Sequence, residues 1–458
     1  MRALGACLSI LLLDFVMDAG ELQPHIIVLD PGHSHASAVF AQSIPGISND
    51  VNIYAPPGPE VRAFLNSVSQ FNLRSQNPTH WNLKPYIGSD FLKRALLEPP
   101  GNIVVISGRN EPKIGRILSC LQAGQNVLAD KPWIIDSKDL PLLEIVLNTA
   151  EEVHRVAYDG MTERFNIAYQ IQRELLRDPD IFGRPMPGTP VEPAVQLENL
   201  HSLVKFNSGK VNLRPAWFFD VRQQGEGVAD VGTHLIDLEM WTLFPDRSID
   251  YRRDVKVLKA GRTPLLLTRS QFERVTGEKA WPAFLHPAIK NDQLEYYCNN
   301  TALFTIRGIY ASIRDQWEYE SSGALDDSYL VLYRGSRSTV RVRQTKEESY
   351  IPEVDVIPNP GMNRATIVAA LQKRLSRLST TFPTLSLRDR GAEIRIVIPK
   401  EVRTRGGPSF AQLVNRFLEY VREPRYLPPW EKTNMLAKYY ITTAAVALAR
   451  STPEDALK

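Results

Sequence analysis

Apolar and amphipathic stretches alternate along the first third of the chain. Four short runs rich in β-branched residues predict buried strands, and they lie at His25–Asp30, Val51–Tyr54, Asn102–Ile106 and Asn126–Ala129. Between them, apolar residues recur at helical spacing over Lys113–Ala123, and Ser34–Gln42 is typical of a helix. Strands that alternate with helices of this length form parallel βαβ units. The pattern predicts a doubly wound parallel sheet over about residues 22–156.

The pattern changes after this region. Glu163–Asp178 has the spacing of one amphipathic helix, and the prolines within Gly183–Pro193 indicate a loop or boundary. Over Val195–Arg343, strand-like runs alternate with turn residues, which is typical of antiparallel strands. We therefore predict a second, more antiparallel domain over residues 157–458. Its clearest predicted elements are a strand pair and a terminal helix, at Tyr329–Tyr333, Ser338–Val342 and Trp430–Arg450.

The first twenty residues differ from the rest of the chain. Arg2 precedes an apolar run, Ala3–Leu13, that ends at Asp14. The run is too short for a membrane-spanning helix, which needs about 20 residues, but it matches the plan of a signal peptide. We expect residues 1–20 to direct export and favour a periplasmic or secreted location over a cytoplasmic one. The alternative is a cytosolic protein with an apolar extension.

Composition narrows the class of protein. The chain has 458 residues, 43% of them hydrophobic, which excludes general disorder and suggests two or three domains. Its 54 Lys and Arg against 51 Asp and Glu give a net charge of +3, so charge gives no reason to expect nucleic acid or an anionic membrane as a partner. Three scattered cysteines, Cys7, Cys120 and Cys298, indicate neither a disulfide framework nor a Cys-rich metal site.

The turn after the first predicted strand is the first candidate site. A strand-to-helix turn presents backbone N–H groups and a helix N-terminus to a pyrophosphate. Against the fingerprint G-x-G-x-x-G/A, Gly32 retains the second glycine, whereas Asp30 and His35 replace the first and third. A dinucleotide site and a turn without a ligand are both compatible with these residues. The cofactor ligands predicted on this turn are Gly32, His33, Ser34 and His35.

The second predicted strand ends at Tyr54, where a dinucleotide site usually has an acid for the ribose. A proline-rich turn follows instead, with Glu60 and Arg62 just beyond it. Tyr54 can stack on adenine and Arg62 can meet the 2′-phosphate of NADP. A turn with neither role is equally compatible.

Lys131 follows the fourth predicted strand, in the sequence Asp130-Lys131-Pro132. The carboxyl end of a parallel strand faces the crevice where open α/β sheets bind ligands, and the proline keeps Lys131 extended. The alternative is an ordinary surface lysine beside a strand end.

A glycine-flanked helix is the most informative segment. Within Gly225–Trp241, Asp230, His234 and Asp237 follow one another at spacings of four and three, which predicts one polar helix face. Such a face at a cleft can hold a histidine as a proton-transfer group beside a carboxylate. Two carboxylates and one histidine are a weak metal set, so we predict no metal site. A helix whose polar groups bond internally is the alternative.

Together these segments resemble the Gfo/Idh/MocA oxidoreductases, the family of glucose–fructose oxidoreductase and inositol dehydrogenase. Asp130-Lys131-Pro132 resembles the family's E-K-P motif, and Gly225–Asp237 resembles its G-G-G-x-x-x-D-x-G-x-H-x-x-D motif with Glu226 at the middle glycine. The family's R-F-x-P-x-Y helix and W-x-x-D strand are resembled by Arg164–Tyr169 and Trp217–Asp220. The resemblance covers about residues 25–245. It implies an α/β fold class, with an N-terminal Rossmann sheet and a C-terminal α+β domain that has a large open, mainly antiparallel sheet.

The resemblance also implies residue roles. Lys131 is expected to bind the reacting hydroxyl or carbonyl and assist its proton transfer, with His234 as general acid/base and Asp230 as its partner or a substrate ligand. Arg164 and Trp217 are expected to bind substrate. NAD or NADP is expected over the turn at Gly32, and its further predicted ligands are Tyr54, Asp130, Lys131 and Pro132.

Three functions stay open at this stage. The first is an NAD(P)-dependent oxidoreductase that transfers a hydride at a CH–OH group of a sugar, polyol or related substrate. The second is an NAD-assisted, redox-neutral glycosidase or lyase, and the third is a sugar-binding relative without cofactor or catalysis. Export and a nicotinamide cofactor are compatible only if the cofactor stays bound. We expect a small carbohydrate-like molecule as partner, no nucleic acid, no membrane span and, from the resemblance, a homo-oligomer.

Overall fold

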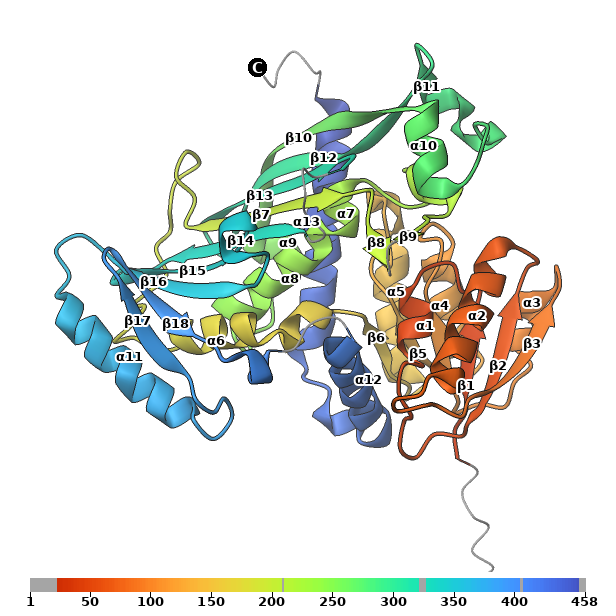
Figure 1. Cartoon of the computed structure of the whole chain (residues 1–458), viewed down its shortest axis with the longest axis horizontal. Coiled ribbons are helices and arrows are strands. Elements are labelled where there is room, and N and C mark those ends of the chain that lie inside the picture. The colour runs from red at the N-terminus through yellow and green to blue at the C-terminus, as the bar shows by residue number, and fades with distance from the viewer. Residues whose placement is uncertain (1–22, 208–209, 321–326, 404–406, 453–458) are drawn as a thin grey trace, which may run out of the picture.

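The computed structural model describes residues 23–207, 210–320, 327–403 and 407–452 (Figure 1). The predicted signal peptide and Cys7 lie outside the described residues. Two sheets dominate the molecule, and in Figure 1 the smaller, red to orange part lies beside the larger, green to blue part. The fold class is the predicted one, a Rossmann-like parallel sheet joined to a larger, mainly antiparallel sheet with helices.

The first sheet has six parallel strands in the order β3-β2-β1-β4-β5-β6. The four predicted strands are confirmed. The two strands that were not predicted are an exposed edge strand without an apolar run, β3, and a three-residue strand, β6. The order reverses between β1 and β4, and this is the point at which such sheets bind ligands. The strands are β1 Ile26–Leu29, β2 Asp50–Ala55, β3 Asn82–Ile87, β4 Ile103–Ile106, β5 Asn126–Ala129 and β6 Ala157–Asp159.

Helix α1, His35–Ala38, is much shorter than the predicted helix Ser34–Gln42, so that prediction is wrong in length. The carbonyl of Phe40 accepts from the indole N–H of Trp81 (2.9 Å). The carbonyl of Ala41 accepts from the guanidinium of Arg74 (2.5 Å). In a longer helix these two carbonyls would accept hydrogen bonds from backbone N–H groups of the next turn. The tertiary bonds therefore compete with the continuation of α1. The other helices around this sheet are α2 Pro59–Leu73, α3 Phe91–Ala95, α4 Lys113–Gln122, η1 Ser137–Asp139 and α5 Leu140–Glu152.

The second sheet has ten strands, nine of them in the order β10-β12-β13-β7-β14-β15-β16-β18-β17, while β11 pairs with β12. Among the described strands of this sheet, only β7 and β13 pair in parallel. The predicted hairpin is confirmed as β14 and β15, with Val331 opposite Val342. The strands are β7 Val195–Ser202, β10 Val255–Thr268, β11 Ile289–Lys290, β12 Gln293–Ile306, β13 Ile309–Glu318, β14 Ser328–Arg334, β15 Ser338–Gln344, β16 Glu353–Pro358, β17 Ser386–Arg390 and β18 Glu393–Val397.

Helices α6, α8, α11 and α13 contribute to the largest hydrophobic core, against the second sheet. The predicted helix Glu163–Asp178 is a 3-10 turn, η2, followed by α6, because Asn166 caps α6 with its side chain. The helices of this region are η2 Thr162–Phe165, α6 Ile167–Leu176, η3 Ala216–Phe219, α7 Gly227–Asp230, α8 Gly232–Leu243, α9 Tyr251–Asp254, α10 Arg269–Thr276, η4 Ala283–Ala288, η5 Lys346–Glu348, α11 Arg364–Leu378, η6 Lys400–Val402, α12 Gly407–Arg422, η7 Pro424–Tyr426 and α13 Trp430–Ser451. Two short strands, β8 Phe206–Asn207 and β9 Lys210–Val211, pair in antiparallel orientation as a separate ribbon.

The last two helices complete the cores of the first sheet. Leu413 and Phe417 of α12 are buried in the cluster that contains Val28 of β1. Tyr439 of α13 is buried in the cluster that contains Ile27, whose side chain points to the opposite face of the same strand. Both faces of the N-terminal sheet are thus closed by residues far along the chain. None of the helices within the described ranges has the length and apolar composition to cross a bilayer.

Candidate active site

The polar turns that follow β1 and β5 lie at one edge of the first sheet. Both strands pair with β4, so their C-terminal ends lie on either side of it. The backbone N–H of Asp130 donates to the carbonyl of Ile106, the last residue of β4 (3.0 Å). The structure therefore brings together residues 30–35 and 130–132, which the sequence predicts as one site.

Lys131 connects this edge to the predicted catalytic helix. Its Nζ donates to Oδ1 (2.5 Å) and to the backbone oxygen (3.0 Å) of Asp230, at the end of α7. Gln224 donates to the other carboxylate oxygen of Asp230 (2.9 Å). Burial alone raises the pKa of Asp230, but the Lys131 ammonium outweighs it and lowers the pKa to about 2. A charged pair therefore bridges the two halves of the molecule. Pro132, buried after a cis peptide bond, follows Lys131.

His234 lies on α8, just beyond this pair. Its Nδ1 is buried and has no hydrogen-bond partner among the described residues. Burial lowers the pKa of His234 well below its usual value, and Lys131 and His35 add to the effect. The imidazole is therefore neutral at pH 7, the form that accepts a proton.

His33 and His35 form a second cluster with Asp130. Their rings meet edge to face with centroids 4.3 Å apart, and their Nδ1 atoms lie 3.8 and 3.5 Å from Oδ2 of Asp130. Burial lowers the pKa of His33 to about 3, and His35 adds to this shift. The charges of Asp230 and Lys131 also act on the pKa of His33, so the cluster lies near the Lys131–Asp230 pair.

The turn after β1 uses its backbone donors internally. The N–H groups of Gly32 and His33 both donate to the carbonyl oxygen of Ser107, after β4 (2.8 and 3.1 Å). Ser34 is exposed and its side chain makes no capping bond to α1. Because α1 has only four residues, it offers little of the aligned dipole that favours a pyrophosphate.

Side chains also fill the crevice above this turn. Arg116 of α4 binds the carboxylate of Asp30 (2.7 Å), the residue at the first glycine position, whose φ is +46°. A Cβ atom on Gly32 would come within 3.2 Å of the Trp217 indole, so the ring lies directly over the turn. The guanidinium of Arg109 lies 5.3 Å from the same ring. Trp217, predicted to bind substrate, therefore packs against the predicted cofactor turn.

The residues at the predicted adenosine end are engaged as well. The hydroxyl of Tyr54 donates to Glu98, and Arg62 is exposed on α2. The N–H groups of Gly32 and His33 are already used, Asp30 places a carboxylate at the turn, and the Trp217 ring packs against Gly32. The residues of this turn therefore do not fit NAD or NADP. We therefore derive no catalytic step through a nicotinamide.

Arg164 and Asp237 belong to a different, fully buried network. Arg164 donates to both carboxylate oxygens of Asp237 (2.6 Å each) and to Glu431 of α13 (2.5 Å). Lys438 of α13 donates to Asp159 (2.6 Å) and Asp237 (3.1 Å). Burial raises the pKa of Asp237, but Arg164 and Lys438 outweigh it and lower the pKa to about 2. The guanidinium of Arg164, predicted to bind substrate, is thus occupied by carboxylates, and Asp237 binds other partners than Asp230 does.

Several residues that shape the site were not singled out from the sequence. Ser107 and Lys113, in the segment after β4, both bind Asp130, and Gln224 binds Asp230. The segment after β4 reaches the same sheet edge as the turns after β1 and β5. Polar residues that follow the third predicted strand could therefore have been included in the predicted site. Glu226, at the middle glycine of the motif, is buried against Arg262 (2.8 Å) and is thus a structural residue.

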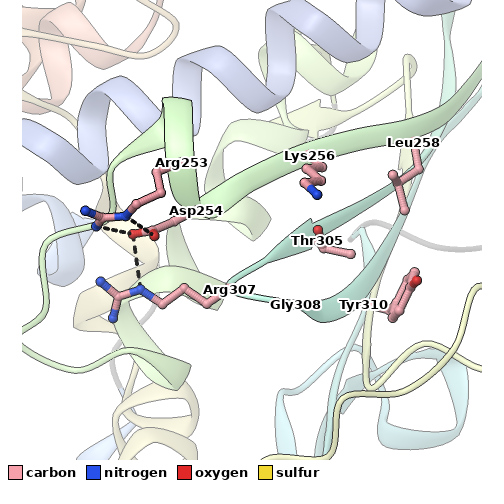
Figure 2. Close-up of a pocket in the computed structure, with 8 residues that line it drawn as sticks. All are labelled: Arg253, Asp254, Lys256, Leu258, Thr305, Arg307, Gly308 and Tyr310. Atoms are coloured by element: carbon pink, nitrogen blue, oxygen red, sulfur yellow. Dashed lines mark hydrogen bonds and ion pairs between the residues drawn. The ribbon is translucent and has the colours of Figure 1, made fainter.

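An open hollow of about 830 Å³ lies elsewhere, at the start of β10 and the β12–β13 turn (Figure 2). Arg253 and Arg307 both bind Asp254 there, at 3.0 and 3.2 Å. Lys256 and Tyr310 also line the hollow. None of the predicted site residues lines it.

Comparison with known proteins adds to this picture. Residues 171–450 match the protein family described as “Putative oxidoreductase C terminal domain”. The crystal structure of “a putative oxidoreductase” from Parabacteroides merdae ATCC 43184 is 39% identical over 94% of this chain and 98% of that chain, with a TM-score of 0.91. No curated protein matches the chain.

More distant structures share the fold. GenD2 from gentamicin A biosynthesis, in complex with NAD, is 13% identical over 94% of this chain and 95% of that chain, with a TM-score of 0.55. A “putative myo-inositol dehydrogenase” from Sinorhizobium meliloti 1021 is 14% identical over 93% of this chain and 97% of that chain, with a TM-score of 0.52.

Proposed function

Since the chain belongs to the Gfo/Idh/MocA family of oxidoreductases, we propose that it is an enzyme that moves a proton at a CH–OH or carbonyl carbon of a polyhydroxylated, carbohydrate-like molecule. The observation that carries this proposal is the Lys131–Asp230 ion pair beside His234, at the edge where α/β sheets bind ligands. These groups are a charged donor, its counter-ion and a neutral base.

Each group has a distinct role in this proposal. The Lys131 ammonium has donors but no acceptor, so it binds a substrate oxygen and stabilises negative charge that develops there. Asp230 orients Lys131 and keeps the buried pair neutral overall. His234, whose Nδ1 has no protein partner among the described residues, accepts and returns the proton.

Hydride transfer to NAD or NADP at the same CH–OH group is a second candidate. The fold shared with GenD2, which was crystallised in complex with NAD, supports it. The Asp30 carboxylate at the turn and the packing of the Trp217 ring against Gly32 both oppose the binding of a pyrophosphate there. Proton transfer by Lys131 and His234 is common to both candidates.

The proposed division of the chain follows from these roles. We propose that residues 22–156 supply the edge that carries Lys131, and that residues 157–458 supply Asp230, His234 and the substrate-binding surface. Residues 1–20 are proposed to direct export. A homo-oligomer is the proposed assembly.

The test is conversion of a substrate panel by the full chain in D₂O. Aldoses, polyols and glycosides are incubated with and without NAD⁺ or NADP⁺, and NMR follows deuterium uptake and products. We expect Lys131→Met and His234→Gln to reduce the rate by about 10²-fold or more, the usual contribution of acid–base groups. The matched controls, exposed Lys138→Met and His80→Gln, should keep the wild-type rate. Wild-type rates in both site variants, or no conversion of any class, contradict the proposal.

A further inference from the structure

A set of metal-ligating side chains lies where β1 and β5 end, beside the proposed proton-transfer residues. His33 and His35 are on the turn after β1, and Asp130 follows β5 directly. One ligand atom from each of the three lies within 4.8 Å of the other two. Two imidazoles with one carboxylate match the ligand sets of catalytic zinc and non-haem iron centres.

The carboxylate of this set is held in a fixed orientation. Lys113, which is fully buried, donates to Oδ1 of Asp130 (2.5 Å), and the Ser107 hydroxyl donates to Oδ2 (2.6 Å). Oδ2 is also the atom nearest the two imidazoles, at 3.8 and 3.5 Å from their Nδ1 atoms. Outer contacts of this kind orient ligands in known metal centres.

The set is open on one side. The side chains of His33 and His35 are 30% and 32% exposed, whereas that of Asp130 is only 8% exposed. A hollow of about 10 Å³ also adjoins His35 and Asp130, but most of its other lining residues are apolar, so the open side of the set is the exposed side of the two imidazoles. Three protein ligands with an open side are typical of catalytic metal sites, whereas structural sites are closed by four.

We propose that His33, His35 and Asp130 bind one divalent transition metal ion of the zinc class and leave coordination positions open to a substrate oxygen. Imidazole nitrogens favour such ions over Mg²⁺ and Ca²⁺. With bonds of about 2.0–2.1 Å, donor atoms of a tetrahedral ion lie about 3.3 Å apart. Binding through the Nδ1 atoms therefore brings them closer to Oδ2 of Asp130 than the present 3.8 and 3.5 Å. It also replaces the bond from the backbone N–H of His35 to Nδ1 of His33 (3.3 Å). This inference rests on ligand geometry and is independent of the proposed reaction.

The test measures metal binding without any substrate. Untagged full-length protein is stripped with chelator and titrated with Zn²⁺ or Mg²⁺ by calorimetry, and bound metal is counted by mass spectrometry. We expect one Zn²⁺ per chain and no comparable binding of Mg²⁺. Co²⁺ in place of Zn²⁺ should give a visible d–d absorption band much stronger than that of aqueous Co²⁺, which reports a four- or five-coordinate protein site.

Histidine variants decide whether the metal lies at this site. His33→Gln with His35→Gln should weaken Zn²⁺ binding by roughly 100-fold or more, because one carboxylate ligand is left. His80→Gln with His154→Gln changes two exposed histidines elsewhere and should leave affinity unchanged. Asp130→Asn is avoided because it leaves Lys113 buried without its counter-ion. His35→Gln alone replaces the pair if circular dichroism shows that the pair does not fold.

Several results would overturn the proposal. Zn²⁺ affinity that is unchanged in the His33/His35 variants, or equally reduced in the His80/His154 variants, places the metal elsewhere. Equal affinities for Mg²⁺ and Zn²⁺ contradict a nitrogen ligand set. A wild-type chain that binds no Zn²⁺ shows that Asp130 and the two histidines form a hydrogen-bonded cluster only.

Discussion

Two ion-pair groups on neighbouring helices contain the same types of residue but differ in their partners. Asp230, at the end of α7, binds Lys131 at the sheet edge, whereas Asp237, two turns later on α8, binds Arg164 and Lys438. The first group lies beside His234, whose Nδ1 has no partner among the described residues. In the second group, three guanidinium nitrogens of Arg164 donate to two carboxylates. The two groups therefore share residue types and differ in their partners: Arg164 is held by two carboxylates, whereas Nδ1 of His234 has no hydrogen-bond partner among the described residues.

The largest loss of stability is expected when the buried group of Arg164, Asp237 and Glu431 is broken. Arg164→Met leaves Asp237 and Glu431 buried without the guanidinium, so we expect the free energy of unfolding to fall by about 3–5 kcal/mol. Lys131→Met should cost less, because it unpairs one carboxylate instead of two, and Asp230 keeps its hydrogen bond from Gln224. Urea denaturation of the two variants measures the difference. Equal losses would show that the two groups are equally structural.

A buried carboxylate near the Lys131–Asp230 pair, with no ion pair among the described residues, gives the next effect, with the opposite sign. Asp315 on β13 is fully buried, and burial together with Asp230 raises its pKa to about 8. The folded chain holds this proton up to about pH 8, while the unfolded chain releases it near its ordinary value of 3.8. The unfolded chain therefore binds fewer protons between these pH values, and stability falls as the pH rises through that window.

Asp315→Asn removes this titration. We expect the variant to exceed the wild type in stability by up to about 5 kcal/mol at pH 8 and to match it near pH 4. Thermal unfolding across this pH range checks the difference. An advantage that is the same at both pH values would show that the effect comes from packing and not from the charge.

The smallest effect on stability is expected at Asp30. Glycine relieves the strain of φ +46° but loses the ion pair to Arg116, and each contribution is about 1 kcal/mol, so the net change should stay within about 1 kcal/mol. The same change removes a carboxylate from the predicted cofactor turn. Quenching of tryptophan fluorescence by NADH should therefore indicate tighter binding to Asp30→Gly than to the wild type. Tight binding to the wild type would contradict the misfit described above.

The local pattern was enough to predict much of the fold. Runs of β-branched residues located β1, β2, β4 and β5, and helical spacing located α4 and α13, because buried strands and amphipathic helices leave these periodicities in any sequence. Spacing also predicted one polar face for Asp230, His234 and Asp237, whereas Asp230 lies on α7 and binds Lys131 and Asp237 lies on α8 and binds Arg164. It could not reveal that α1 ends after one turn, because tertiary partners, Trp81 and Arg74, take its next carbonyls.

The sequence by itself determined the fold class, the family and the segments that meet at the sheet edge, since each is encoded in short-range pattern or motif. Only the tertiary structure decided which polar groups are already satisfied. It pairs Arg164 with Asp237 and Glu431, gives the N–H groups of the Gly32 turn to Ser107 and places Trp217 over that turn. These contacts join residues far apart in sequence, and whether a polar group is free to act depends on such partners, so no local pattern records it.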